Sequence, residues 1–315
     1  MTIAVIFPGQ GSQQTGMLKE LYDAHPVVGE VFAEASEVFG QDLWSLVQTG
    51  PDDVLADTRV TQPVMFTSDV AVWHVLRHSG LPEPAAVAGH SLGEFAALVA
   101  AEVLSFSDGC TVVKRRAQLM AEAVPEGQGG MAALIGLDDA AVEELCHDMK
   151  GGSVLEAVNF NAPGQVAISG HLEVVEKAVV EAKARGARKA VVLPVSVPNH
   201  SSLMQEAGAQ LAETIDAVAF HPPKFPIVQN ADATAPADLN TLTTSLKAHV
   251  YNPVQWTRSV QALRDQFGVT KLIESGPGKV LTGLSKRIDR ALPCSPVNSV
   301  DTLAAALDAI TPVEN

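Results

Sequence analysis

A serine between two glycines constrains this chain most. Gly89–Gly93 reads Gly-His-Ser-Leu-Gly and follows a run of small apolar residues, Ala85–Ala88. An alanine-rich segment with helical spacing comes next, with Phe95 and Val99 among its apolar positions. The pattern predicts a strand, a very tight turn and a helix, with Ser91 at the amino end of that helix.

This placement leaves two roles open for Ser91. A nucleophile needs a hydroxyl that projects from the sheet edge toward free N–H groups. Alternatively, the serine merely caps the helix that follows it. Because a lone Gly-x-Ser-x-Gly is only moderately specific, the rest of the chain has to decide.

Length and composition exclude several classes of protein. A chain of 315 residues is enough for one large domain or two smaller ones. No stretch approaches the ~18 uninterrupted apolar residues of a membrane span, and no secretory signal precedes the first strand-like segment. The odd number of distant cysteines predicts a reduced, cytoplasmic protein without a zinc site. These cysteines are Cys110, Cys146 and Cys294.

Charge and motif spacing exclude further ligands. The formal net charge is −15, and no basic patch interleaved with aromatic residues occurs, so we expect no nucleic-acid partner. His74 and His78 have the spacing of a metal pair on a predicted helix from Gln62 to Gly80, but no third ligand is evident. The Gly-x-Gly of Gly9–Gly11 lacks the rest of a dinucleotide fingerprint. We therefore expect neither a metal nor a cofactor.

The order of predicted elements indicates an α/β fold with an inserted subdomain. Residues 3–7 form a continuous apolar run that predicts a buried parallel strand, and helices are expected over 17–40 and 42–48. Between 131 and 193 the pattern changes to β-α-β-β-α-β, which is the split ferredoxin-like unit. We expect a core of residues 1–127 and 198–315, an insertion of residues 128–197, and a frayed tail from Thr311.

A basic cluster follows on the next helix. Lys114, Arg115 and Arg116 lie on a helix predicted from 107 to about 124. A helix over 92–103 rises about 16 Å, and a returning helix over 107–116 descends about 13 Å, which brings Arg116 near the level of Ser91. A buried arginine there could clamp a carboxylate, although spacing leaves open which of the three points inward.

A lone histidine stands before another predicted helix. His200 follows Pro198 and Asn199, at the return from the insertion to the core. Such a histidine is usually an ordinary capping or core residue. It gains catalytic interest only if Ser91 needs a base.

Six motifs then occur in one order along the chain. Together they closely resemble the malonyl-CoA:acyl carrier protein transacylases of bacterial type II fatty-acid synthesis, over about residues 2–300. The motifs are Phe7–Gln13, Gly89–Glu94, the Arg116 helix, Val197–His200, Tyr251–Val254 and Gly276–Leu281.

This resemblance implies an α/β-hydrolase-like core with a ferredoxin-like insertion, and it implies roles for individual residues. Ser91 would be the acylated nucleophile and His200 its general base. Gln10 and the Leu92 backbone N–H would line the oxyanion hole. Arg116 would bind the free carboxylate of the malonyl group.

The family orients its histidine by a backbone carbonyl near the segment that corresponds to Ala248–Val250, and not by an acidic side chain. Relatives often carry Gln at the position of His249 and Ser at the position of Asn199. These departures matter only if a side chain helps to control the tautomer of the base.

The implied reaction moves malonyl from malonyl-CoA to the phosphopantetheine thiol of acyl carrier protein by a ping-pong cycle through an acylated Ser91. It needs no cofactor, and we expect a monomer. An acidic carrier protein needs a local positive face, although a scattered solvated set of charges is an equal alternative. The candidates are Lys183, Arg185, Arg188, Lys189, Lys286 and Arg287.

Other functions are compatible with part of this sequence pattern. A free-standing acyltransferase of a polyketide pathway, or the malonyl transferase of a malonate decarboxylase system, would share the chemistry. An α/β-hydrolase esterase would use water and an acidic triad member, but no Asp or Glu stands where the order of strands and loops clearly demands one. A catalytically silent carrier-binding module would not need the intact Ser, His, Gln and Arg set.

Overall fold

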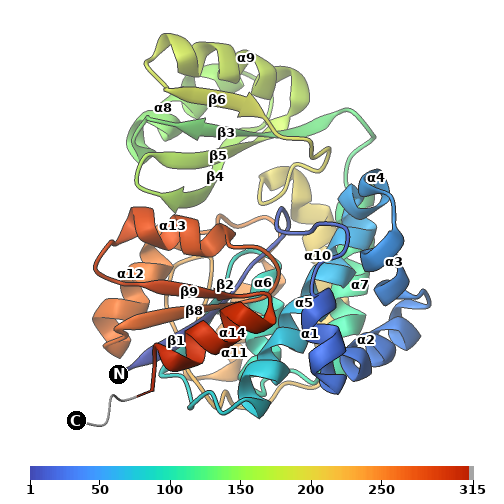
Figure 1. Ribbon diagram of the computed structural model, residues 1–315. Coiled ribbons are helices and arrows are strands. Elements are labelled where there is room, and N and C mark those ends of the chain that lie inside the picture. The colour runs from blue at the N-terminus through green and yellow to red at the C-terminus, as the bar shows by residue number, and fades with distance from the viewer. Residues whose placement is uncertain (312–315) are drawn as a thin grey trace.

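Five parallel strands form the central sheet of this computed structural model, which describes residues 1–311. Their order is β7-β2-β1-β8-β9, so β1 lies in the middle and its neighbours come from distant parts of the chain (Figure 1). The strands are β1 (Ile3–Phe7), β2 (Ala86–Gly89), β7 (Ile227–Val228), β8 (Lys271–Ser275) and β9 (Cys294–Val297).

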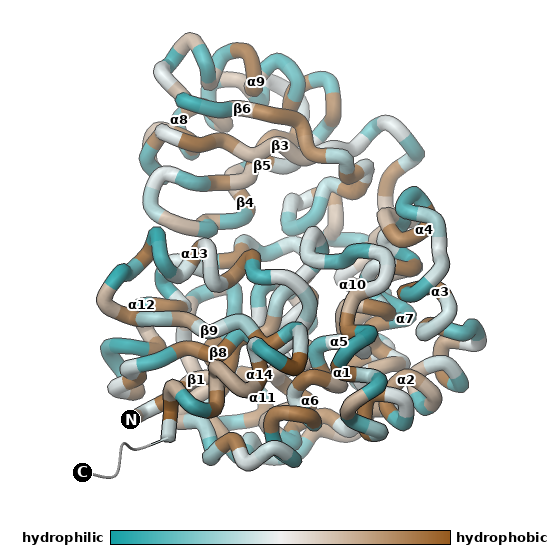
Figure 2. Tube along the Cα trace, in the orientation of Figure 1, coloured by the Kyte–Doolittle hydropathy of each residue, from teal (hydrophilic) through white to brown (hydrophobic). Residues whose placement is uncertain are grey.

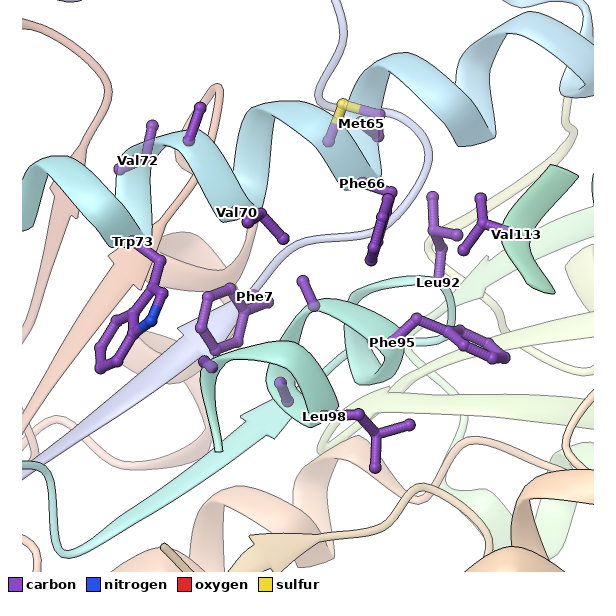
Figure 3. Close-up of a cluster of buried hydrophobic side chains, with 14 of the residues drawn as sticks. Phe7, Met65, Phe66, Val70, Val72, Trp73, Leu92, Phe95, Leu98 and Val113 are labelled. Atoms are coloured by element: carbon purple, nitrogen blue, oxygen red, sulfur yellow. The ribbon is translucent and has the colours of Figure 1, made fainter. Parts of the chain in front are cut away.

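The sheet is buried on both faces, as a parallel sheet must be. Along β1, Ile3, Val5 and Phe7 enter one hydrophobic cluster, whereas Ala4 and Ile6 enter another. Figure 3 shows the first cluster, in which Phe7 lies among side chains of the helices α5 and α6.

The two hydrophobic clusters receive residues from different numbers of helices. The cluster of Phe7 takes residues from the larger set of helices. These are α1 (Lys19–Ala24), α2 (Pro26–Phe39), α3 (Leu43–Thr49), α4 (Asp52–Ala56), α5 (Thr58–His78), α6 (Gly93–Ala100), α7 (Phe106–Glu122), α10 (Gln205–Asp216), α11 (Leu239–Lys247) and α14 (Val300–Asp308). The opposite cluster takes residues from α12 (Trp256–Phe267) and α13 (Val280–Ile288).

A separate antiparallel sheet stands above this core (Figure 1). Its order is β4-β5-β3-β6, and it has its own hydrophobic cluster with α8 and α9. Hydrophobic residues concentrate along β3 (Figure 2). The elements are β3 (Gly129–Ile135), α8 (Asp139–Lys150), β4 (Leu155–Ala162), β5 (Gln165–His171), α9 (Leu172–Ala184) and β6 (Lys189–Val192).

The structure confirms the α/β class with a parallel sheet, and it corrects two details. The helix expected over 17–40 is wrong as one unit, because Pro26 begins α2 and His25 before it is extended. The short strand β9 and the helix α14 have no counterpart among the elements expected from the sequence. The tail expected to fray lies, beyond Thr311, outside the described residues.

Candidate active site

Ser91 occupies a strained turn between β2 and α6. Its φ angle is 50°, in the left-handed region that a non-glycine residue enters at a cost of about 1–3 kcal/mol. The turn closes because its glycines have no side chains. A Cβ on Gly89 would lie 1.9 Å from the carbonyl carbon of Gly93, and one on Gly93 would lie 2.1 Å from the Phe7 carbonyl oxygen. The serine therefore stands at the carboxyl end of β2, as the pentapeptide predicts.

His200 meets this serine from a segment 109 residues away. Ser91 Oγ lies 2.7 Å from His200 Nε2. On the other side of the ring, Nδ1 faces the carbonyl oxygens of His249 at 3.1 Å and Asn252 at 2.9 Å. Because carbonyls only accept, Nδ1 carries the proton and Nε2 presents its lone pair to the serine hydroxyl. This is the tautomer that a general base needs.

The expected contact with a main-chain carbonyl is confirmed at His249, and the Asn252 carbonyl is a second one that the sequence does not predict. His200 itself has a φ angle of 63°, and its N–H donates to the Val250 carbonyl at 3.0 Å. Two residues further on, the N–H and hydroxyl of Ser202 donate to the Glu156 carboxylate on β4. The segment that carries His200 is thus held by the 249–252 turn and by the antiparallel sheet.

Burial lowers the pKa of His200 to about 3, and the charge of the nearby Arg116 guanidinium is the second cause of this shift. The two carbonyls at Nδ1 oppose it. The imidazole is therefore neutral at physiological pH and able to accept a proton. The imidazolium that forms when His200 accepts a proton would lie beside the Arg116 cation. An anion bound to Arg116 would therefore favour proton transfer to His200.

Of the three basic residues on α7, only Arg116 points inward. Its side chain is 1% exposed, whereas Arg115 bonds Gln118 and Gln210, and Lys114 bonds the Val38 carbonyl. Its Nη2 lies 3.4 Å from Ser91 Oγ.

Burial lowers the pKa of Arg116 to about 9, so the guanidinium keeps its charge near neutral pH. Its Nε has no hydrogen-bond partner among residues 1–311. A buried cation with a free donor beside the Ser91 hydroxyl suits an anionic ligand.

Two polar residues on α5, which were not among the expected site residues, join this arginine to Gln10. Gln62 Oε1 accepts a hydrogen bond from Arg116 Nη1, and Gln62 Nε2 donates to Thr58 Oγ1 at 2.9 Å. Gln10 Nε2 donates to the same Thr58 oxygen at 3.0 Å. In the sequence, only the four-residue spacing of Thr58 and Gln62 indicates that they share a helix face. The sequence pattern places the start of this helix at Gln62, whereas the helix begins at Thr58.

The two expected oxyanion donors come from neighbouring segments. Leu92 begins the turn into α6, and no hydrogen bond within the described residues uses its N–H. The strand that leads to Gln10 runs beside the turn, since the Phe7 carbonyl accepts from the His90 N–H at 2.9 Å. One donor of the Gln10 amide faces Thr58, and its second N–H is left for a ligand.

No metal site emerges within residues 1–311, where no three His, Cys, Asp or Glu side chains are grouped to hold an ion. The rings of His74 and His78 lie 6.3 Å apart on α5. None of the helices in the same part of the chain has the length and apolar character that crossing a membrane requires.

Comparison with known proteins decides the family. A model of the acyl transferase domain matches residues 4–300. The chain belongs to the acyl transferase family. The malonyl CoA-acyl carrier protein transacylase of Salmonella typhimurium is 49% identical to this acyl transferase, over 96% of this chain and 98% of that protein. The Escherichia coli K12 transacylase is 48% identical, over 97% and 98%.

Solved structures agree with the fold throughout. The malonyl CoA-acyl carrier protein transacylase of Coxiella burnetii has a TM-score of 0.97 at 41% identity, covering 99% of this chain and 98% of that one. A malonyl-transacylase solved with a type II PKS acyl-carrier protein has a TM-score of 0.96 at 45% identity, covering 98% and 100%.

The charge of Arg116 yields a prediction about pH. In Arg116→Ala the pKa of His200 rises, because the guanidinium lowers it in the wild type. Modification of Ser91 by the neutral reagent phenylmethylsulfonyl fluoride needs neutral His200. The acid limb of the pH–rate profile for this modification should therefore move to higher pH. Arg115→Ala, which removes the same charge from the same helix, should leave the limb in place. A limb that is unmoved, or that moves to lower pH, in Arg116→Ala contradicts this electrostatic effect.

Proposed function

We propose that this acyl transferase moves the malonyl group from malonyl-CoA to the phosphopantetheine thiol of acyl carrier protein and so supplies fatty-acid elongation. The observation that carries the proposal is the buried Arg116, whose Nη2 lies 3.4 Å from Ser91 Oγ. A hydrolase of neutral esters has no use for such a cation. The names of the relatives at 48–49% identity point to the same substrates.

The first half-reaction acylates Ser91. His200 Nε2 takes the hydroxyl proton while Oγ attacks the thioester carbonyl of malonyl-CoA. The tetrahedral intermediate then expels the thiol of coenzyme A as its C–S bond breaks, and His200 returns the proton to the departing sulfur. Malonyl remains on Ser91 as an oxygen ester.

The second half-reaction reverses these roles. The phosphopantetheine thiol gives its proton to His200 and attacks the ester carbonyl. The bond from Ser91 Oγ to the malonyl carbon breaks, and Oγ recovers the proton from His200. No water enters the balance, so the cycle is a ping-pong transfer and not a hydrolysis.

Both half-reactions form an oxyanion, for which we assign the Leu92 N–H and the free N–H of the Gln10 amide as donors. Preorganised donors of this kind typically contribute about 2.7–4 kcal/mol each. Thr58 fixes the Gln10 amide from behind through its 3.0 Å hydrogen bond.

Selectivity for malonyl would come from Arg116. Its guanidinium would bind the free carboxylate through a two-point hydrogen bond, and Gln62 would fix the plane of the fork. An acetyl group leaves this buried cation unpaired, which is costly. The bound carboxylate would also offset the charge that lowers the pKa of His200, so the correct substrate makes the base stronger.

We further propose that residues 1–127 and 198–315 form an α/β-hydrolase-like core and residues 128–197 a ferredoxin-like insertion. The order β4-β5-β3-β6, with both helices joined to the sheet by one hydrophobic cluster, supports the insertion. The nucleophile turn after a parallel strand supports the core. The monomeric state, the absence of a cofactor and the cytoplasmic location stay predictions from the sequence.

A polyketide pathway is the second candidate for the carrier. It is favoured by one observation, the 45% identity to a malonyl-transacylase solved with a type II PKS acyl-carrier protein. The chemistry at Ser91 would be the same. Transfer assays with fatty-acid and polyketide carrier proteins, compared at equal concentration, separate the two.

We propose that the carrier docks at a basic cleft between the antiparallel sheet and α13. The cleft has a volume of 640 Å³ and brings together basic side chains from β6, α13 and the residues beside them, although the chain as a whole carries −15. Its basic residues are Arg188, Lys189, Lys286, Arg287 and Arg290. Two of the expected residues do not line it: Lys183, and Arg185, which pairs with Asp148 and Glu181.

Substitution of Arg116 tests the selectivity. Arg116→Ala should slow acylation by malonyl-CoA on the order of 100-fold or more, because the variant cannot pair the carboxylate. Acylation by acetyl-CoA should fall much less. Intact-mass measurement of the acylated protein after timed quenching gives both rates, with Arg115→Ala as control. Equal losses for the two acyl groups would remove the role of Arg116 in selection.

Charge reversal tests the docking cleft. Lys189→Glu or Arg287→Glu should slow transfer from malonyl-Ser91 to the carrier about tenfold at low salt, while acylation by malonyl-CoA stays nearly unchanged. Lys177→Glu, an exposed residue of α9 outside the cleft, is the matched control. If transfer is unaffected in both cleft variants, the carrier docks elsewhere.

A further inference from the structure

A buried amide spans the nucleophile turn from behind. Asn230 follows β7, the strand beside β2, and its side chain reaches both ends of the turn. Its Oδ1 accepts from the Ser91 N–H at 2.7 Å, and its Nδ2 donates to the Gly89 carbonyl at 2.6 Å. The two bonds bracket the residue whose φ angle is 50°.

The orientation of this amide is set by a buried carboxyl group. Glu94, in the first turn of α6, is 1% exposed and accepts hydrogen bonds from the Asn230 N–H at 2.8 Å and from Asn230 Nδ2. Because an ionised carboxylate only accepts, the ionised form of Glu94 selects the rotamer in which Nδ2 faces Glu94 and Oδ1 faces the Ser91 N–H. The flipped amide would turn its own N–H donors toward the N–H of the serine.

We infer that Asn230 is a positioning residue that holds Ser91 in its reactive conformation, and that Glu94 holds Asn230 in the one orientation that does so. The inference rests on the proposed role of Ser91 as nucleophile. Within residues 1–311, the hydrogen bonds of the Ser91 hydroxyl go to His200 and Arg116 and to neither of these side chains. Without the amide, the strained backbone of Ser91 is free to relax toward ordinary φ angles, which would carry Oγ away from His200 Nε2.

The neighbouring Gln229 supplies a matched control. Its Nε2 also donates to Glu94, at 3.3 Å, and to the Leu242 carbonyl at 3.0 Å, but it makes no hydrogen bond to the turn. Truncation of Gln229 disturbs the same buried cluster but keeps both hydrogen bonds from Asn230 to the turn around Ser91. A purely structural role for Asn230 would therefore make the two truncations equivalent.

An exchange of chemical groups gives a sharper test. In Asn230→Asp at low pH, the introduced carboxyl group and Glu94 share a proton, and this proton replaces the amide donor. At high pH the proton dissociates, and two carboxylates then face each other. Burial already raises the pKa of Glu94 to about 7. The other titratable groups that bear on this carboxyl are His249, whose Nε2 lies 3.7 Å away, Asp232 and Arg116.

The rate of Ser91 modification by phenylmethylsulfonyl fluoride is measured against pH for the full chain, with malonyl-Ser91 formation in parallel. Relative to wild type, Asn230→Asp should lose about 100-fold in rate as the pH rises through the titration of the pair, since a displacement of ~1 Å costs that much. The double variant Glu94→Gln with Asn230→Asp, in which the new amide donates to the new carboxylate, should abolish this loss. Gln229→Ala should stay within about threefold of wild type.

Three outcomes overturn the inference: an Asn230→Asp rate that follows wild type at every pH, a double variant that keeps the loss, or a Gln229→Ala rate that falls as far. Thermal unfolding of each variant shows that the rates belong to folded protein. If wild type reacts with the sulfonyl fluoride but never acquires malonyl, the proposed function fails while the positioning role is still decided by the sulfonyl fluoride rates.

Discussion

The 2.7 Å hydrogen bond between Ser91 Oγ and His200 Nε2 depends on almost every part of the fold. The serine is presented by the parallel sheet, where two glycines permit a turn that no larger residues could close. The histidine is presented by a loop that two backbone carbonyls and the Glu156 carboxylate hold in place. Each partner has a positive φ angle, so the surrounding structure, and not local preference, maintains the pair.

In the part of the chain that the structure describes, the partners of His200 Nδ1 are two main-chain carbonyls and not an acidic side chain. A carboxylate beside His200 would stabilise the imidazolium, and main-chain carbonyls do so more weakly. Burial and Arg116 both oppose protonation of the ring. The anion that would balance these effects is the one that the proposed substrate brings. The carboxylate of malonyl would then be both the feature recognised and a charge that strengthens the base.

The sequence predicts the local features well, and the contacts between distant segments poorly. The strand, turn and helix around Ser91 follow from adjacent residues, and the return of Arg116 follows from helix lengths. The network of Thr58, Gln62 and Gln10 cannot be predicted from local sequence because it joins a loop after β1 to the start of α5. The same holds for Asn230, which meets Ser91 across 139 residues. Arg185 is among the basic residues predicted for docking, but the fold pairs it with Asp148 and Glu181 and keeps it out of the proposed cleft.

The most direct test of the proposed chemistry locates the malonyl group. The wild-type chain is mixed with malonyl-CoA, quenched in acid within one turnover and digested, and the modified peptide is sequenced by mass spectrometry. We expect one malonyl group, carried as an ester on Ser91, that is absent from Ser91→Ala and disappears when carrier protein is added before the quench. A malonyl group on another residue, or transfer to carrier that persists in Ser91→Ala, would contradict the central role of this serine.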